Sequence, residues 1–255
     1  MSDAATPDSA IHLEGVSKVF GRAGTETAYR AVDGLNLDVR PGQMLALLGK
    51  TGCGKSTIFN MIAGLTEPSS GTVRVQGRDP FADFDSFRGK MAIVFQDDRL
   101  LPWRSAIANV ELGLEMLDIP AAERRTTAQL WLTKLGLGGH ENDFPHALSG
   151  GMRQRVSIAR AFATNANILL CDEPFSALDE STAARLRAEF VRLVKENNKT
   201  AVFITHSISE AMEIGDRIVV LKRPATIAYD VSFDGDTGRA DRELIRSRIG
   251  EVLSA

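Results

Sequence analysis

The stretch Gly49-Lys50-Thr51-Gly52-Cys53-Gly54-Lys55-Ser56-Thr57 decides the fold of this chain. The apolar run over residues 44–48 before it has the length of a strand, and the apolar spacing over residues 58–63 suits a helix. Glycines adopt backbone conformations closed to other residues, so the N–H groups of such a loop can turn inward around a phosphate chain, and the helix N-terminus adds partial positive charge. Lys55 would contact the outer phosphates, and the Ser56 hydroxyl would bind Mg²⁺. These nine residues therefore predict a nucleoside triphosphate site, whereas the alternative is a glycine-rich turn without a ligand.

Composition sets the limits within which this site is interpreted. A chain of 255 residues accommodates one large α/β domain, or a core with subdomains. The net charge of −3 and the dispersed basic residues argue against nucleic acid as a partner. The two cysteines, Cys53 and Cys171, are far apart, so neither a disulfide framework nor a zinc site is expected. No apolar run approaches the ~20 residues that span a bilayer, so any membrane role would depend on partners.

The segments beside the phosphate strand alternate apolar and polar residues in the manner of half-buried strands. Residues 11–20, 35–39 and 72–76 show this pattern, and we expect them to form a small, largely antiparallel sheet. Phe20 ends the first of these segments. It could fill a core position or offer its ring to an adenine, and position alone favours the core.

The middle of the chain changes from strands to helices. The apolar run over residues 91–95 predicts a strand that carries Gln96 to its end, where functional groups gather in open α/β sheets, and Gln96 is a candidate metal contact. Helical patterns follow over residues 106–117 and 121–135, so a helical subdomain is expected at about residues 97–163. The last helix follows Ser149, Gly150 and Gly151. Ser149 is a plausible N-cap, and this turn is either an ordinary cap or a second anion site.

Acidic residues and a histidine end the next two predicted strands. The apolar run over residues 168–171 leads to Asp172 and Glu173, and carboxylates at such a position are costly unless they serve a cation or a water molecule. Asp172 would hold Mg²⁺, and Glu173 would orient or deprotonate the attacking water. The alternative is a pair of surface acids. The strand over residues 200–205 places His206 at the same edge, which favours a γ-phosphate contact over a structural histidine.

The ordered set of motifs resembles the nucleotide-binding subunit of ATP-binding cassette (ABC) transporters. The resemblance covers the chain from Ile11 to about Leu221 and rests on six motifs, namely residues 49–57, Gln96, the signature Leu148–Met152, Asp172-Glu173, the loop Ser176–Asp179, and His206. It implies a RecA-like P-loop NTPase core with an antiparallel β subdomain and an inserted α-helical subdomain. It also implies that two copies sandwich two ATP molecules head to tail, so that Ser149, Gly150 and Gly151 act across the dimer and Asp179 belongs to the nucleotide site.

The resemblance also bears on the adenine and on the membrane partners. Phe20 matches the family's adenine-stacking aromatic, with Tyr29, in what looks like an insertion, as its rival. The run Leu100-Leu101-Pro102-Trp103 resembles the importers of nitrate, sulfonate and taurine, although Asp97-Asp98 is not part of that pattern. These apolar side chains could dock a permease subunit or pack inside the helical subdomain.

We therefore expect a disordered lead over residues 1–10, an ABC domain over residues 11–230, and a tail over residues 231–255 with an amphipathic helix carrying Ile245, Ile249 and Val252. The expected function is an ATPase on the cytoplasmic face of the inner membrane that binds ATP and Mg²⁺, forms a homodimer, and powers permease subunits supplied by a solute-binding protein. The alternatives are an exporter or lipid-transport ATPase, a cassette ATPase acting outside transport, and a subunit that senses ATP without hydrolysing it.

Overall fold

The computed structural model describes residues 9–21, 28–233 and 238–254. Most of the expected N-terminal lead, residues 1–8, lies outside the described residues. The chain divides into two compact units, of which the first comprises residues 1–87 and 200–255 and the second residues 88–199.

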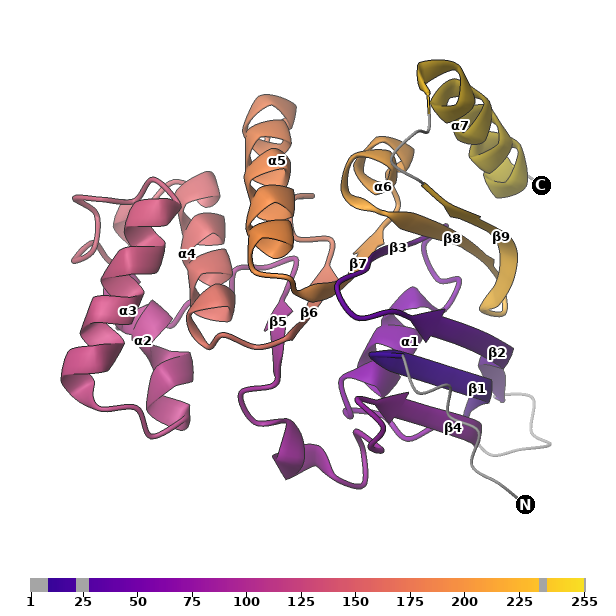
Figure 1. The fold of residues 1–255 in the computed structure, drawn as a ribbon, viewed down its shortest axis with the longest axis horizontal. Coiled ribbons are helices and arrows are strands. Elements are labelled where there is room, and N and C mark those ends of the chain that lie inside the picture. The colour runs from indigo at the N-terminus through magenta and orange to yellow at the C-terminus, as the bar shows by residue number, and fades with distance from the viewer. Residues whose placement is uncertain (1–8, 22–27, 234–237, 255) are drawn as a thin grey trace. The chain divides into compact units, whose positions relative to one another are not determined.

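A small antiparallel sheet belongs to the first unit. Its strand order is β2-β1-β4, formed by β1 (Ile11–Phe20), β2 (Tyr29–Val39) and β4 (Ser70–Val75) (Figure 1). The sequence predicted this antiparallel sheet, and both pairings of β1 are antiparallel. The second strand begins at Tyr29 rather than at Leu35, and β1 and β2 pair through register irregularities that simple alternation does not reveal.

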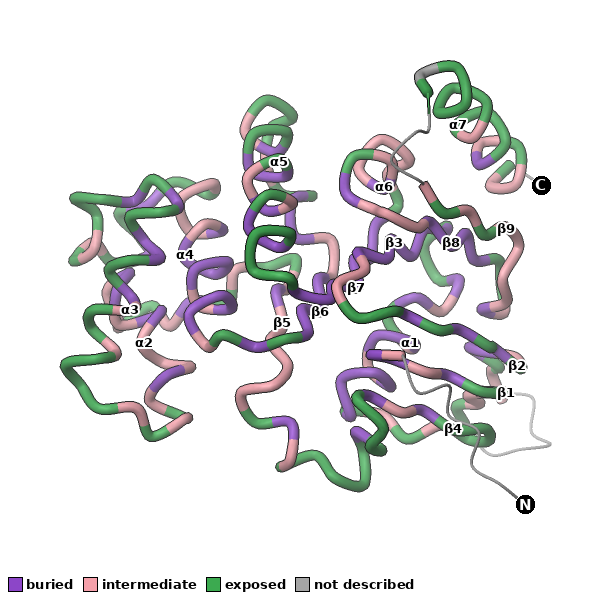
Figure 2. The backbone as a smooth tube through the Cα atoms, viewed as in Figure 1, coloured by how far each residue is buried: buried purple, intermediate pink, exposed green. Residues whose placement is uncertain are grey.

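The strand that precedes the phosphate loop is the centre of the first unit. All residues of β3 (Met44–Gly49) are buried, as Figure 2 shows, because the strand lies between β7 (Thr200–Thr205) and β8 (Arg217–Lys222), both parallel to it. An unbroken apolar run is typical of such a strand. The antiparallel strand β9 (Thr226–Ser232) pairs with the other side of β8.

Among its described residues, the first unit also contains three helices and a 3₁₀ turn, η1 (Phe84–Phe87). The helix α1 (Lys55–Ile62) follows the phosphate loop. The helices α6 (Ile208–Ile214) and α7 (Arg239–Ser254) pack on one apolar cluster with β3 and β8. From α7 this cluster includes fully buried Ile249, and Ile245, Val252 and Leu253 pack against it, so one face of the terminal helix covers the sheet.

The second unit joins two parallel strands to a group of helices. The strands are β5 (Met91–Val94) and β6 (Ile168–Asp172), and the helices are α2 (Ala106–Met116), α3 (Ala121–Lys134), α4 (Gly150–Ala163) and α5 (Glu180–Glu196), with a 3₁₀ turn η2 (Pro145–Ala147). Aromatic pairs join three of the helices. The Phe162 ring of α4 lies 5.1 Å from that of Trp131 in α3 and 5.8 Å from that of Phe190 in α5, centroid to centroid. Within the described ranges, every helix falls short of the length and apolar character that a bilayer crossing requires.

Candidate functional site

The phosphate loop is closed by its own lysine. Lys55, the first residue of α1, is buried, and its Nζ donates to the carbonyl oxygens of Gly49 at 2.6 Å and Lys50 at 3.1 Å. The ammonium group therefore lies over the start of the loop, at the carboxyl end of β3. Gly52 and Gly54 have φ angles of 77° and 107°, a region that favours glycine, and these angles turn the backbone from the strand into the helix.

The loop leaves no space for side chains at two of its glycines. A Cβ atom at Gly49 would lie 2.6 Å from Cys53 Sγ and 2.8 Å from the Leu221 carbonyl oxygen. A Cβ atom at Gly54 would lie 2.4 Å from the Ala31 carbonyl oxygen. The loop backbone therefore packs closely against β2 and β8, and only glycine fits at these two positions.

The strand register places His206 beside this loop within the first unit. Leu48 of β3 pairs with Thr205 of β7, so Gly49 and His206 leave neighbouring strand ends at the same edge of the sheet. His206 is exposed, whereas Thr205 is buried and its hydroxyl donates to Glu210 at 2.5 Å. The sequence placed Lys55 and His206 at one sheet edge, and the register agrees with that placement.

The two aromatic candidates face each other across strands β1 and β2. Phe20 pairs with Tyr29, and its side chain is 43% exposed, with Lys18 Nζ 5.2 Å from the ring centroid. The position-based expectation that Phe20 fills the core is therefore wrong, because β1 ends at this residue. Tyr29 is the first residue of β2, and its hydroxyl donates to the Gly52 carbonyl oxygen at 3.1 Å.

In the second unit the glutamine and the two carboxylates follow paired strands. Val94 of β5 pairs with Cys171 of β6 in parallel, so Gln96, Asp172 and Glu173 gather at one edge. Burial raises the pKa of the Cys171 thiol, which marks a dry strand directly before the acids. Glu173 has a φ angle of 45°, unusual for a non-glycine residue, and its carbonyl oxygen accepts a hydrogen bond from the Ser176 hydroxyl at 3.0 Å.

The signature turn and the loop before α5 both end in helix caps. Ser149 Oγ accepts from Met152 N at 3.3 Å, which confirms Ser149 as the N-cap of α4. Asp179 caps α5 in the same way, accepting from Thr182 N at 3.1 Å and from the Ser181 hydroxyl at 2.7 Å. The pKa of Asp179 is lowered to about 2, first by the Ser181 hydroxyl and then by Thr182. A Cβ atom at Gly151 would lie 3.0 Å from Thr182 Cγ2, so the two caps are neighbours.

The loop after Gln96 is held by hydrogen bonds to side chains whose roles the sequence did not predict. Fully buried Asn109 accepts from Leu101 N at 2.7 Å and donates to three backbone carbonyl oxygens of this loop, those of Leu101, Arg104 and Ser105. Arg160 of α4 donates to the Asp98 and Arg99 carbonyl oxygens at 2.8 and 2.9 Å. The Arg160 bonds join segments more than 60 residues apart in sequence, so a local pattern gives no sign of them.

The apolar side chains of the same loop divide between the two expected roles. Leu100 is buried, as the packing alternative requires, whereas the Trp103 side chain is 71% exposed, as the docking alternative requires. Exposed tryptophan is enriched at binding surfaces. The loop is therefore anchored by one apolar residue and presents another to the solvent.

The predicted site residues divide between the two units. The phosphate loop, Phe20 and His206 belong to the first, and Gln96, Ser149, Asp172, Glu173 and Asp179 belong to the second. Apart from Phe20, which ends an antiparallel strand, the residues of each group lie at the carboxyl ends of parallel strands or at helix starts within their own unit. That the two groups meet on one triphosphate stays a prediction.

Comparisons with known proteins place these residues in context. The profile of the family described as ABC transporter matches residues 32–176. An uncharacterized ABC transporter ATP-binding protein of Methanocaldococcus jannaschii is 41% identical over 92% of this chain and 86% of its own length. An aliphatic sulfonates import ATP-binding protein of Pseudomonas syringae is 40% identical over 95% of this chain and 81% of its own. A solved dimeric ATP-binding cassette in a post-hydrolysis state, bound to ADP and Pi, superimposes with a TM-score of 0.77 at 33% identity, covering 88% of this chain and 99% of that one.

Proposed function

Because the chain belongs to the ABC transporter family and is the ATPase subunit of such a transporter, we propose that it powers an importer of small organic or inorganic anions. The observation that carries the proposal is the phosphate loop closed by Lys55 at the end of a buried parallel strand. The family explains why such a loop is joined to a signature turn and an acidic strand on the same chain.

The proposed chemistry is in-line attack of water on the γ-phosphate of ATP. Such a reaction depends chiefly on positioning and charge stabilisation, so the loop N–H groups and Lys55 would hold the phosphates while His206 contacts the γ-phosphate. Glu173 would accept a proton from the attacking water. The hydrogen bonds to its carbonyl oxygen fix the turn that carries it, which supports a positioned base.

The donor set fits a Mg²⁺ ion. Ser56, Gln96 and Asp172 offer a hydroxyl, an amide carbonyl and a carboxylate, which are hard oxygen ligands, and Mg²⁺ usually keeps several waters beside one or two carboxylates. Among the described residues no three His, Cys, Asp or Glu side chains gather into a metal cluster, so the site would rely on phosphate oxygens and water as well. When bound by these residues, the ion would offset the negative charge of the phosphates.

We infer that two copies act together. The dimeric cassette to which the chain is similar supports a pair in which the phosphate loop of one copy faces Ser149, Gly150 and Gly151 of the other. The free N–H groups of a helix start suit a phosphate, and Ser149 already holds this turn in the capped form.

The membrane partners and the substrate class follow from the loop after Gln96. Exposed Trp103 offers an anchor for a permease subunit, which would hold the protein on the cytoplasmic face of the inner membrane. The sulfonate-import relative supports a small anion as cargo, delivered by a solute-binding protein. Movement of Gln96 during ATP hydrolysis would reach the permease through this loop.

Replacement of the proposed base tests the assignment. Glu173→Gln keeps the shape of the side chain, so ATP binding should persist while phosphate release falls by about 10²–10⁴-fold, the usual contribution of a general base. Glu196→Gln is the matched control, because Glu196 is an exposed residue of α5 that pairs with Arg192, on the same helix face and away from the strand end that carries Glu173. Near-normal phosphate release by Glu173→Gln would refute the role of Glu173.

A further inference from the structure

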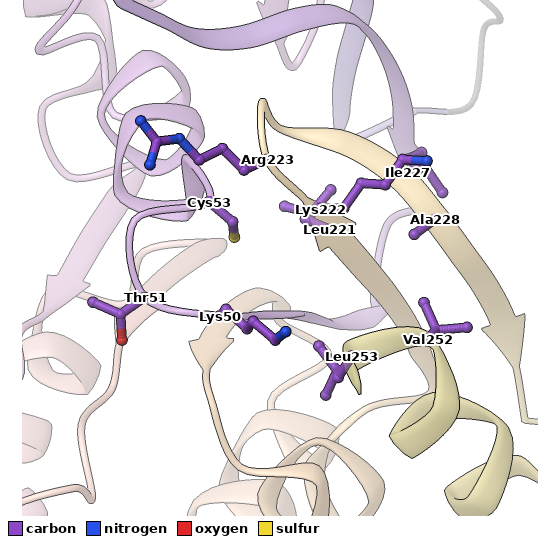
Figure 3. Close-up of a pocket in the computed structure, with 10 residues that line it drawn as sticks. All are labelled: Lys50, Thr51, Cys53, Leu221, Lys222, Arg223, Ile227, Ala228, Val252 and Leu253. Atoms are coloured by element: carbon purple, nitrogen blue, oxygen red, sulfur yellow. The ribbon is translucent and has the colours of Figure 1, made fainter. Parts of the chain in front are cut away.

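A pocket of about 640 Å³ lies beside the phosphate loop, on the side of strand β8. Figure 3 shows that its lining comes from three parts of the first unit: the phosphate loop, the β8–β9 hairpin and the last turn of α7. Its volume is within the range of about 300–1,000 Å³ that is typical of small-molecule sites. The candidate adenine partners, Phe20 and Tyr29, do not line it.

The charged residues that line this pocket are all basic. Its lining includes Lys50, Lys222 and Arg223 and has no acidic residue. In the described part of the chain, no carboxylate forms an ion pair with any of the three. The Arg223 guanidinium, however, lies over the Tyr29 ring, 5.0 Å from its centroid, which leaves Lys50 and Lys222 as the cations available to a ligand. Figure 3 shows the Lys50 side chain extending toward Leu253, into the open space. Unpaired cations around a concave surface favour an anion, and removal of that anion from water costs less where several cations share its charge.

The remaining wall of the pocket is apolar. Leu221 of β8 is buried, and Val252 and Leu253 of α7 are partly buried against the sheet cluster. Ile227 and Ala228 of β9 complete this wall. A bare inorganic anion would leave these side chains without a partner, whereas a ligand with a short hydrocarbon part would cover them.

We propose that this pocket binds a small organic anion, with one acidic head group and a short apolar body, at a site separate from that of ATP. The head group meets Lys50, whose side chain extends into the open space, and the body lies on Val252 and Leu253. Lys222 adds positive charge on the β9 side of the pocket. Because Lys50 and Cys53 belong to the phosphate loop, and the Lys50 carbonyl oxygen accepts a hydrogen bond from Lys55, the occupied pocket bears directly on the nucleotide site. The site thus gives the ATPase a means of responding to an organic anion.

Isothermal titration of the full chain with hexane-1-sulfonate tests the site. We expect one binding site per chain, with sulfate and hexan-1-ol each binding at least about tenfold more weakly, since each supplies only half of the ligand. Lys222→Ala removes positive charge from the pocket rim, so it should raise the dissociation constant severalfold, and Leu253→Ser should also raise it severalfold. Lys134→Ala is the control, because Lys134 lies in α3, packed on the Trp131 ring. Binding of ATP, measured separately, should be unchanged in the Lys222 and Leu253 variants.

Three results would overturn the proposal. The first is that Lys222→Ala binds hexane-1-sulfonate with an unchanged dissociation constant. The second is that well over one molecule of hexane-1-sulfonate binds per chain. The third is simple competition between hexane-1-sulfonate and ATP, because the pocket would then be an extension of the nucleotide site. The proposed ATPase chemistry does not depend on any of these results, since Glu173 and Lys222 lie on different units and are tested by different measurements.

Discussion

Arg153 Nε donates to Asp98 Oδ2 at 2.9 Å, and this ion pair joins the loop after Gln96 to the first turn of α4. The Nη1 atom of the same guanidinium donates to the Leu148 carbonyl oxygen at 2.8 Å, directly before Ser149. One side chain therefore holds both the glutamine loop and the residue that precedes the signature cap. We therefore expect that a displacement of one of these segments also moves the other.

Asp98→Ala should weaken this link without removing the nucleotide site. Because both side chains are partly exposed, the loss should be about 1 kcal/mol in the free energy of unfolding, the upper end for such pairs. We expect unchanged ATP affinity and a severalfold slower release of phosphate, because the signature turn and the glutamine loop would no longer move together. Urea unfolding and a phosphate-release assay measure the two effects.

Asp97→Ala is the control for this prediction, since Asp97 is the exposed neighbour of Asp98. Asp98→Asn adds a second comparison, because an amide oxygen can still accept from Leu100 N, the bond that Asp98 Oδ1 accepts at 3.1 Å. If the Asp97→Ala and Asp98→Ala variants release phosphate at the same rate, the ion pair does not couple the signature turn to the glutamine loop.

Buried Asn109 should contribute more to stability than the exposed pair. Asn109→Ala removes the partners of several loop backbone groups, and each buried group left without a hydrogen bond costs about 1–3 kcal/mol. We expect the free energy of unfolding to fall by about 2–4 kcal/mol in urea denaturation. Asn142→Ala, at an exposed asparagine of the same unit, should change it by less than about 0.5 kcal/mol. If Asn109→Ala lowers the free energy of unfolding no more than the control does, water must replace the hydrogen bonds of the Asn109 amide.

The two aromatic candidates can be separated by ATP affinity. Phe20→Ala should weaken ATP binding by about 2- to 12-fold, corresponding to stacking of roughly 0.5–1.5 kcal/mol. Tyr29→Phe keeps the ring but removes the hydroxyl bond to Gly52, so it should alter affinity little if Phe20 is the stacking residue. Unchanged affinity in Phe20→Ala, together with a loss in Tyr29→Ala, would reverse the assignment. Equilibrium binding of a fluorescent ATP analogue supplies both numbers.

Local patterns were sufficient for much of this structure. The long helix over residues 180–196, the strand over residues 200–205 and the cap at Ser149 follow from periodicity and capping chemistry, which depend on near neighbours. The family resemblance was correct because it rests on spaced motifs. The exposure of Phe20 and the start of β2 at Tyr29 were missed, because both depend on the irregular register of β1 with β2.

The long-range contacts around the glutamine loop could not be predicted from the sequence for a similar reason. Asp98 and Arg153 are 55 residues apart in sequence, and nothing in either neighbourhood signals the pair. The pocket beside the phosphate loop is a comparable case, because its cations come from the loop and from the β8–β9 hairpin, and part of its apolar wall comes from α7. Functional surfaces assembled from distant segments require the fold before they can be recognised.

The cap at Asp179 gives stability a defined dependence on pH. Hydrogen bonds from Ser181 and Thr182 lower the pKa of this carboxyl from 3.8 to about 2, so the folded state favours the carboxylate. Its stabilisation is therefore fully present above about pH 4 and is lost as the pH falls toward 2. Asp179→Asn keeps a capping oxygen but removes the charge, so the free energies of unfolding of the wild type and this variant should differ at pH 5 and converge below pH 4. Urea denaturation of the nucleotide-free protein at several pH values measures this difference, and a difference that grows toward low pH would contradict the capping role.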